Sequence, residues 1–391
     1  MIWPMDPSAD GSPRLPRHFP TLDGIRGLAI VLVVSHQLNR LVGNDLLTRL
    51  ADHVLVGGWA GVQLFFVLSG FLISGILLDS RESPDYFRNF YIRRALRIFP
   101  IYYFALLLFI VALPALGIVP LAWHENQLPL WLYYSNWPPY AGGTALLPHF
   151  WSLAVEEQFY LVWPLLVHSR SPRALLRLCA VLAVASLLAR VAMVAAGIGS
   201  EAIYMNSFSR LDALVAGSAV AAMLRVPGWL PRMMALMRPR SLLPLCILGA
   251  VVFEMAFGYK SHQPSGQTIG YTLLSVMFAL LILAAACSDA AGGRPGTWAR
   301  LLQSAMLRSV AKYSYGMYIF HKPMSDLLGD PLLKSLGYSE GLSLPEQVMY
   351  LMVGDGCVFV VGMLSYWMVE RHFLRLRPRF GRAPNAQRGS S

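Results

Sequence analysis

Two side chains that could do chemistry lie in one apolar run near the start of the chain. Arg26 and His36 are ten positions apart in the stretch LDGIRGLAIVLVVSHQ, residues 22–37. Charged and titratable side chains are costly to bury in hydrocarbon, so inside a membrane they mark functional sites by default. Histidine has an unperturbed pKa of about 6.5 and can accept a proton at neutral pH. We therefore predict that His36 acts as a general base.

A pair of carboxylates is the expected partner of this histidine. Glu156 and Glu157 are adjacent in the apolar stretch 150–168, at a depth similar to that of His36. Neighbouring helical residues point about 100° apart, so only one of the two need face the interior, and the sequence does not choose between them. A carboxylate beside a histidine sets its tautomer. We predict that His36, oriented by Glu156 or Glu157, forms the catalytic set. His321 and Asp355 are expected at the same depth, where a packing role is an equal alternative.

Arginines crowd the approach to the third apolar run. Arg88, Arg93, Arg94 and Arg97 lie within ten residues of one another. One interpretation is a positive cluster at the membrane surface. The other is an anion clamp, because guanidinium groups match phosphate oxygens. We predict that Arg93, Arg94 and Arg97, joined by Arg26, bind a phosphorylated ligand.

A third polar group is expected near the opposite membrane surface. Arg210 and Asp212 lie in the segment SRLD, residues 209–212, and either pair with each other or line an acceptor site. His149 is expected at the same level. We predict that these three residues and His321 contact a substrate.

The composition determines where such residues must lie. Of 391 residues, 56% are hydrophobic and 14% charged, whereas soluble domains carry about 25% charged residues. Apolar runs of about 20 residues, long enough to cross a bilayer, recur along the chain. This pattern predicts an all-α, polytopic membrane helix bundle, with the lipid bilayer as one partner. The net charge of +11 is interpreted as a topology signal and not as a nucleic-acid surface. The four cysteines are isolated, so neither a metal nor a disulfide framework is expected.

Ten spans account for the distribution of positive charge. They are 22–40, 55–78, 99–122, 150–168, 178–197, 207–224, 242–257, 268–287, 310–328 and 346–369. With Arg40 and Lys322 counted at the outer ends of their spans, 23 arginines and lysines lie on one side and five on the other, which predicts that both termini are cytoplasmic.

The remaining segments complete the expected organisation. Residues 79–98 are predicted to form a separate amphipathic helix on the cytoplasmic surface. Residues 128–137 are apolar but too short to span, and either re-enter the membrane or lie in its interface. We expect a disordered lead at 1–20, one transmembrane domain at 21–370 and a basic tail at 371–391.

Six sequence blocks occur in an order that resembles the membrane-bound acyltransferase family 3. They are LDGIRGLAIVLVVSHQ, GVQLFFVLSGFLISGILL, RRALRIFPIYY, FWSLAVEEQFYLVWPLL, SRLDALVAGSAVA and SYGMYIFH. The resemblance implies transfer of an acyl group, usually acetyl from acetyl-CoA, to a hydroxyl of a carbohydrate or glycolipid. It implies roles for Arg26 and His36, for the arginine block and for the glutamate pair. One departure is that nine residues separate Arg26 from His36 where the family commonly has ten. A step of ten positions leaves the two about 80° apart around an ideal helix.

These features together predict an O-acyltransferase of the bacterial inner membrane. Acyl-CoA is the expected donor, without a metal, and a cell-envelope glycan such as lipopolysaccharide or another polysaccharide is the expected acceptor. His36 either removes the acceptor's proton or briefly carries the acyl group. The rival function is a transporter or flippase that uses the charged midplane as a substrate or proton path.

Overall fold

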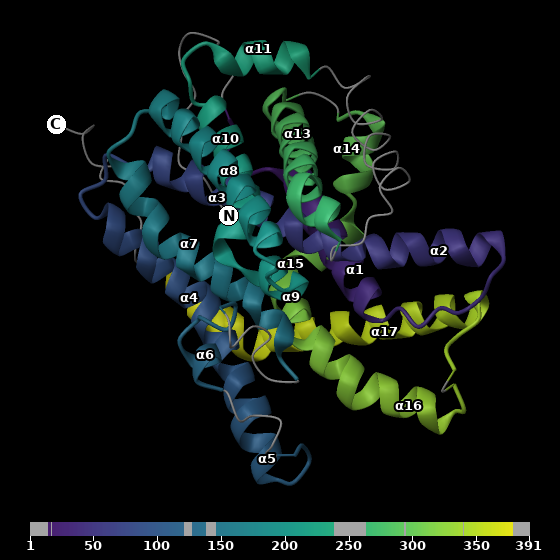
Figure 1. Cartoon of the computed structure of the whole chain (residues 1–391). Helices are drawn as coiled ribbons and strands as arrows, with labels where there is room; N and C mark the ends of the chain where they lie inside the picture. The colour runs from purple at the N-terminus through teal and green to yellow at the C-terminus, as the bar shows by residue number, and fades with distance from the viewer. Residues whose placement is uncertain are drawn as a thin grey trace.

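The computed structural model of the chain describes residues 15–16, 18–120, 127–137, 146–237, 263–292, 295–338 and 340–377. This part of the chain is a bundle of helices without strands, apart from one isolated bridge between Leu41 and Leu342. The prediction of an all-α architecture is confirmed. Figure 1 shows α1 and α15 in the middle of the bundle and the long α17 crossing beside them.

The helices, with short 3-10 and π segments labelled η, have the following bounds. They are α1 Pro20–Gln37, α2 Leu46–Val56, η1 Gly57–Trp59, α3 Ala60–Asp79, α4 Tyr86–Leu106, η2 Leu107–Ala112, α5 Leu113–Ala115, α6 Leu128–Trp131, η4 Pro148–Phe150, α7 Trp151–His168, α8 Pro172–Ala195, α9 Ser200–Met205, α10 Ser207–Met223, α11 Trp229–Leu236, η5 Gly266–Gly270, α13 Tyr271–Ala290, α14 Thr297–Leu302, α15 Ala305–Met324, η6 Ser325–Gly329, α16 Asp330–Ser335, α17 Leu344–Ser365, η7 Tyr366–Glu370 and α18 Arg371–Leu374.

Local sequence signals account for where several of these helices begin. Pro20 occupies the first turn of α1, where its missing N–H is no loss. The side chain of Asp45 accepts a hydrogen bond from the backbone of Thr48 at 3.0 Å and caps α2. Ser343 and Glu346 form a capping box at the start of α17.

Five helical segments of the described chain are long and apolar enough to cross a membrane. They are Leu46–Asp79, Tyr86–Ala115, Pro172–Ala195, Gly266–Ala290 and Leu344–Leu374. Of the helices that carry candidate site residues, α4 lies within one of these segments, and α1, α7, α10 and α15 do not. The charged and polar side chains of these four helices lower their hydropathy, and α10 is also short, with 17 residues. Each predicted span overlaps a helix except 242–257, which lies outside the described residues. A membrane-embedded helix bundle is supported, while ten spans and cytoplasmic termini stay predictions.

The arginine-rich segment differs from its predicted form. We expected a surface helix at 79–98 that is separate from the third span. Instead α4 continues through Pro100 and into η2 and α5, giving one helical segment Tyr86–Ala115. The physical reason is that Arg94 and Arg97 point into the bundle toward other polar groups, so this stretch has no need to lie flat on the membrane surface.

Close glycine contacts hold the centre of the bundle together. A Cβ added to Gly70 of α3 would lie 1.8 Å from the backbone oxygen of Leu214 in α10, and one on Gly217 would lie 1.8 Å from that of Val67. Small residues at such crossings let membrane helices approach closely. Gly70 and Gly217 therefore allow α3 and α10 to pack closely.

We predict that Gly70→Ala destabilises the bundle by about 3 kcal/mol, because α3 and α10 must separate to admit the methyl group. Gly356→Ala is the matched control, since a Cβ there meets nothing within 4 Å. Thermal unfolding in detergent should show a lower midpoint for Gly70→Ala and an unchanged or higher one for Gly356→Ala. Equal midpoints for the two variants would contradict the close crossing.

The apolar segment 128–137 packs against protein. Tyr102 of α4 donates its hydroxyl to the backbone oxygen of Leu130 at 2.7 Å. Gln158 of α7 donates its amide to the backbone oxygen of Tyr133 at 2.8 Å. The segment is therefore held against α4 and α7, and the ring of Tyr133 stacks on that of Tyr102 with centroids 4.2 Å apart.

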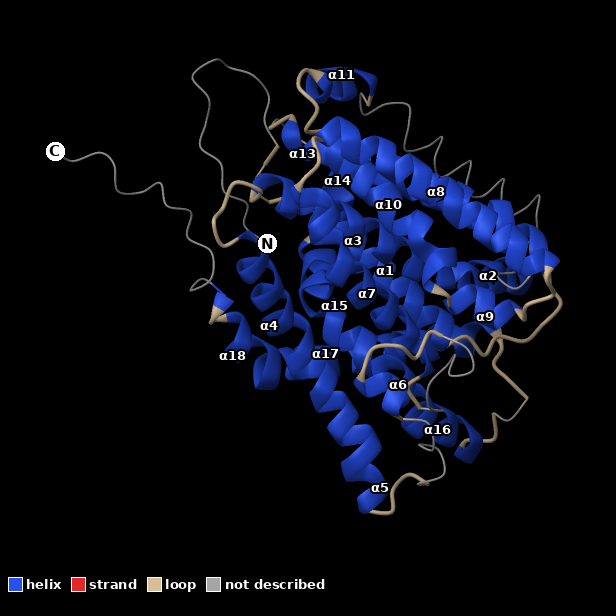
Figure 2. Cartoon of the chain, turned by 60° about the vertical axis from the view of Figure 1, so that its left-hand side comes forward, coloured by secondary structure: helices blue, strands red, loops and turns tan. Residues whose placement is uncertain are grey.

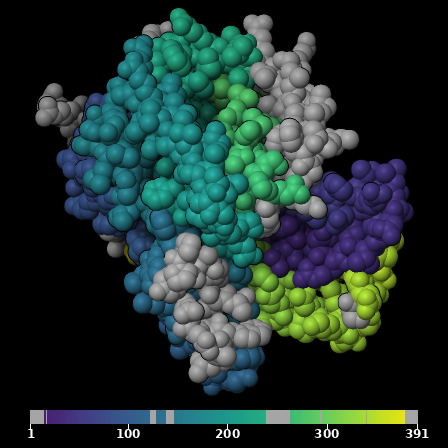
Figure 3. Space-filling model, viewed as in Figure 1, coloured from purple at the N-terminus to yellow at the C-terminus, as the bar shows by residue number. Residues whose placement is uncertain are grey.

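Segments from early and late in the chain pack against each other. In Figures 1 and 2 α17 lies beside α1 and α15, and in Figure 3 the purple and yellow-green surfaces meet. Arg40, just after α1, forms an ion pair with Asp330 at 2.7 Å. This contact ties the end of the first helix to α16.

Candidate functional site

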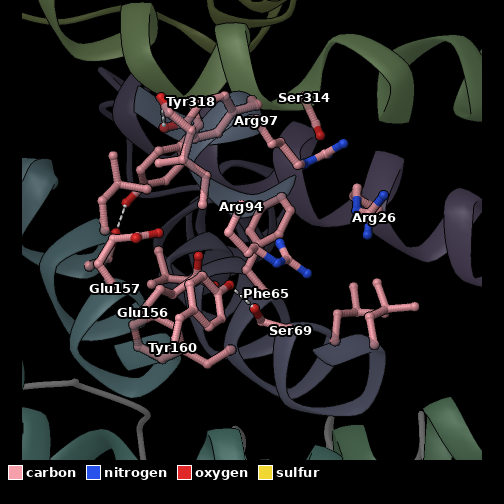
Figure 4. Close-up of a pocket in the computed structure, with 18 residues that line it drawn as sticks. Arg26, Phe65, Ser69, Arg94, Arg97, Glu156, Glu157, Tyr160, Ser314 and Tyr318 are labelled. Carbon is pink, nitrogen blue, oxygen red and sulfur yellow. Dashed lines mark hydrogen bonds between the residues drawn. The ribbon is translucent and has the colours of Figure 1, made fainter. Parts of the chain in front are cut away.

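A cavity of about 110 Å³ lies between α1, α3, α4, α7 and α15 (Figure 4). Its lining combines guanidinium groups, carboxylates, hydroxyls and apolar side chains. The lining residues are Arg26, Val62, Phe65, Phe66, Leu68, Ser69, Leu72, Arg94, Arg97, Ile98, Ser152, Leu153, Glu156, Glu157, Tyr160, Ser314, Tyr315 and Tyr318. The volume has room for a few waters or a small acyl group and is far too small for a nucleotide.

The structure brings together three of the four arginines predicted to bind an anion. Arg26 comes from α1, and Arg94 and Arg97 from α4, and all three line the cavity. Arg93 is not among the lining residues, because a neighbouring position on α4 points about 100° away from Arg94. The arginine cluster therefore faces two ways, into the cavity and away from it.

Both glutamates line the cavity. Figure 4 shows Glu156 and Glu157 on the same side of it, near Tyr160. The hydroxyls of Tyr160 and Ser69 hydrogen-bond to each other and lie against Glu156. The guanidinium of Arg94 lies 5.0 Å from the centroid of the Tyr160 ring. Cations and carboxylates thus meet in one cavity.

His36 has a different partner from the one predicted. Its Nδ1 lies 2.9 Å from the backbone oxygen of Leu55, and no hydrogen bond joins it to Glu156 or Glu157 among the described contacts. The reason is rotation around α1: Arg26 turns toward the cavity, and ten positions later His36 turns toward η1, against Gly58. A carbonyl can only accept, so Nδ1 of the neutral ring carries the hydrogen and Nε2 keeps a free lone pair. A backbone carbonyl therefore does the orienting that we assigned to a carboxylate.

His149 and His321 form a pair behind the cavity wall. Their ring centroids are 4.7 Å apart. Nδ1 of His321 lies 2.7 Å from the backbone oxygen of Tyr318, and His36 is one of its electrostatic neighbours. The hydroxyls of Ser152 and Tyr318, 2.5 Å apart, lie between this pair and the cavity. His149 and His321 thus lie next to the cavity, and His36 is an electrostatic neighbour of His321.

Asp355 lies beside the same region. It accepts a hydrogen bond from Ser35 at 3.0 Å, and Ser35 precedes His36 in α1. The prediction that α17 brings a carboxylate to the level of His36 is confirmed.

Asp212 pairs with Arg190 and not with Arg210. Its Oδ2 accepts hydrogen bonds from Arg190 and Thr272, each at 2.9 Å, and both Arg190 and Asp212 are fully buried. The suggested Arg210–Asp212 pair is wrong, because on α10 these positions point about 160° apart. Neither residue lines the cavity.

Arg210 is buried among aromatic rings. Its guanidinium lies 4.4 Å from the ring centroid of Tyr271, 4.7 Å from that of Tyr204 and 5.7 Å from that of Trp151. These faces attract a cation without hydrogen bonds. A role of Arg210 and Asp212 in substrate contact stays a prediction.

A family model described as an acyltransferase domain matches residues 19–369. The chain belongs to the acyltransferase 3 family. It is 27% identical over 380 residues to the peptidoglycan O-acetyltransferase OatA of Listeria monocytogenes, covering 90% of this chain and 55% of that protein. It is 29% identical over 334 residues to the putative peptidoglycan O-acetyltransferase YrhL of Bacillus subtilis, covering 79% and 49%. No solved structure matches the chain.

Relatives of this acyltransferase 3 chain are about twice as long as the part they share with it. A third relative, the O-acetyltransferase OatA of Staphylococcus aureus, is 27% identical over 326 residues, which cover 79% of this chain and 51% of that protein. The chain therefore spans about half the length of the curated relatives it matches.

Sequence reasoning missed the hydroxyl groups of this cavity. Ser69, Tyr160, Ser152 and Tyr318 all line it. Spacing gave a usable signal for one of them, because Tyr160 is four positions after Glu156 and so shares its helix face. The serines carried no such signal, since serine is common in membrane helices as a packing residue.

Proposed function

We propose that the chain transfers an acyl group, most simply acetyl, from acyl-CoA to a hydroxyl of a cell-envelope glycan. The observation that carries this proposal is one cavity in which Arg26, Arg94 and Arg97 meet Glu156 and Glu157. His36 is not among the residues that line it and lies further along α1. Family membership and relatives named as O-acetyltransferases support the reaction class.

We assign Arg26, Arg94 and Arg97 to binding of the acyl-CoA donor. Guanidinium groups bind phosphate oxygens through charge-assisted hydrogen bonds. The excess of positive charge on their side of the predicted topology favours the cytoplasm, where acyl-CoA is made. The cavity takes only the thioester end, which then points toward the hydroxyls of Ser152 and Tyr318.

His36 is assigned to the acceptor. Nε2 takes the proton of the acceptor hydroxyl as its oxygen attacks the thioester carbon. The carbon–sulfur bond then breaks, and the departing CoA thiolate takes the proton from the imidazolium. Each proton and electron pair is accounted for without a metal.

The acceptor is assigned to the outer side of an inner membrane, where envelope glycans lie. Two of the relatives are named for peptidoglycan, which makes a peptidoglycan hydroxyl the first acceptor to test. Lipopolysaccharide and other polysaccharides are the alternatives.

The test uses the purified full chain in lipid nanodiscs with acetyl-CoA labelled in the acetyl group. We expect label to appear in peptidoglycan fragments, or in another envelope glycan. If none of these glycans receives label from acetyl-CoA, the proposal is overturned.

A second prediction addresses the donor arginines. We expect Arg97→Ala to raise the KM for acetyl-CoA about tenfold, because a hydrogen bond to a charged phosphate is lost. Arg88→Ala is the control, since Arg88 lies in the same helix but is exposed and pairs with Asp85 at 2.8 Å. A donor KM that is the same in both variants would contradict the assignment of Arg97.

A further inference from the structure

The chain continues past its last long helix toward the arginine cluster. After η7, α18 spans Arg371–Leu374 and the described chain runs on to residue 377. The helix packs against α4, and Figure 2 shows the two side by side. The C-terminal end of the described chain therefore lies beside the helix that carries Arg93, Arg94 and Arg97.

Arg377 is an electrostatic neighbour of these arginines. Burial, followed by the charges of Arg97, Arg94 and Arg93, lowers the pKa of Arg377 to about 9. Its Nε is buried and has no hydrogen-bond partner among the described residues. A guanidinium held against three others with an unused donor is an unfavourable arrangement unless an anion is present.

Few carboxylates balance this group. Glu370 is an electrostatic neighbour of Arg97, while Glu156 and Glu157 lie against Arg94 inside the cavity. Arg93 and Arg377 lie outside the cavity lining. Positive charge is therefore in excess on the side of α4 that faces α18.

The size of the cavity limits which part of acyl-CoA can enter it. At about 110 Å³ the cavity is smaller than the pockets that usually hold a whole nucleotide. If the thioester of acyl-CoA enters it, the phosphates must remain outside, near its arginine end. Arg93 lies next to Arg94 in α4, and Arg377 is an electrostatic neighbour of both. Phosphate is the anion that guanidinium groups match best.

We propose that Arg377, together with Arg93, binds a phosphate of the CoA nucleotide, so that the segment after α17 forms part of the donor site. This inference rests on the proposed function, because it takes acyl-CoA to be the donor. It adds Arg377, which follows α18, to a site that otherwise lies on helices such as α1 and α4.

The test measures binding of CoA to the full chain in nanodiscs by calorimetry, without any acceptor. We expect Arg377→Ala to raise the Kd for CoA about tenfold, and Arg377→Lys to raise it less. Arg375→Ala is the matched control, because Arg375 is two positions away and exposed. It should leave the Kd within about twofold of wild type, since surface charges away from a ligand contribute little.

Dephospho-CoA then locates the phosphate. If Arg377→Ala does not raise the Kd for dephospho-CoA, Arg377 binds the 3′-phosphate of CoA. If Arg377→Ala raises the Kd for dephospho-CoA as well, Arg377 binds the diphosphate. Equal affinities of Arg377→Ala and Arg375→Ala for CoA would overturn the inference and leave the proposed function standing. Failure of the wild-type chain to bind CoA would instead remove the proposed function itself.

Discussion

Replacing His36 by alanine is expected to lower the rate of acyl transfer by about 10²–10⁴-fold, the usual contribution of a general base. The orientation of the ring is the reason: its Nδ1 is held by the backbone oxygen of Leu55 at 2.9 Å, so Nε2 presents its lone pair. Donor binding should be unchanged, because the arginines lie at the other end of α1 and on α4. The measurement is the single-turnover rate of label transfer, with the Kd for CoA measured in parallel.

His53→Ala is the matched control for this prediction. Nδ1 of His53 lies 2.8 Å from the backbone oxygen of Arg49, which is the same kind of contact, but this ring is exposed on α2. It should transfer label at the wild-type rate. If His36→Ala did so too, with normal CoA binding, the assignment of His36 as the base would be wrong.

The same experiment separates the two roles open to His36. An acyl-histidine intermediate predicts a burst of CoA release, one per protein, when acyl-CoA is mixed with wild type in the absence of acceptor. Direct transfer predicts no burst. Both mechanisms require His36 for acyl transfer, whereas a histidine with only a packing role is not required for it.

The sequence was sufficient to predict that Arg26 and Arg94 lie close together. Arg26 and Arg94 lie near the same end of their helices, and inward-facing charge is the least costly arrangement in a membrane bundle. Depth along a span follows from counting residues, at about 1.5 Å for each. Asp355 and His36 were placed at one level in this way, and Ser35 joins their helices.

The sequence could not predict how each helix is rotated about its own axis. The two wrong pairings share this cause. Depth alone paired His36 with Glu156 or Glu157, whereas α1 turns the ring toward Leu55. Proximity in sequence suggested that Asp212 pairs with Arg210, whereas α8 brings in Arg190 from the other side. Which residue faces which neighbour depends on close crossings such as that at Gly70, and these are set by the whole bundle.

The buried pair of Arg190 and Asp212 leads to the largest expected effect on stability. Their charged groups are 2.9 Å apart, and both side chains are fully buried. Removing one member of such a pair leaves an uncompensated buried charge, which costs about 3–5 kcal/mol. We expect Asp212→Ala to lower the unfolding free energy by this amount, measured by denaturant unfolding in detergent.

Two comparisons make this result interpretable. Asp85→Ala removes a carboxylate from the exposed pair with Arg88 and should change the unfolding free energy by less than about 1 kcal/mol. The double variant Arg190→Leu with Asp212→Leu should recover much of the loss, because no charge is then left unpaired. If Asp212→Ala instead kept wild-type stability but raised the KM for the acceptor, Asp212 would belong to a substrate site, as the sequence predicted. If Asp212→Ala instead loses stability and the double variant regains it, Asp212 is needed to neutralise Arg190, whose guanidinium reaches from α8 to α10.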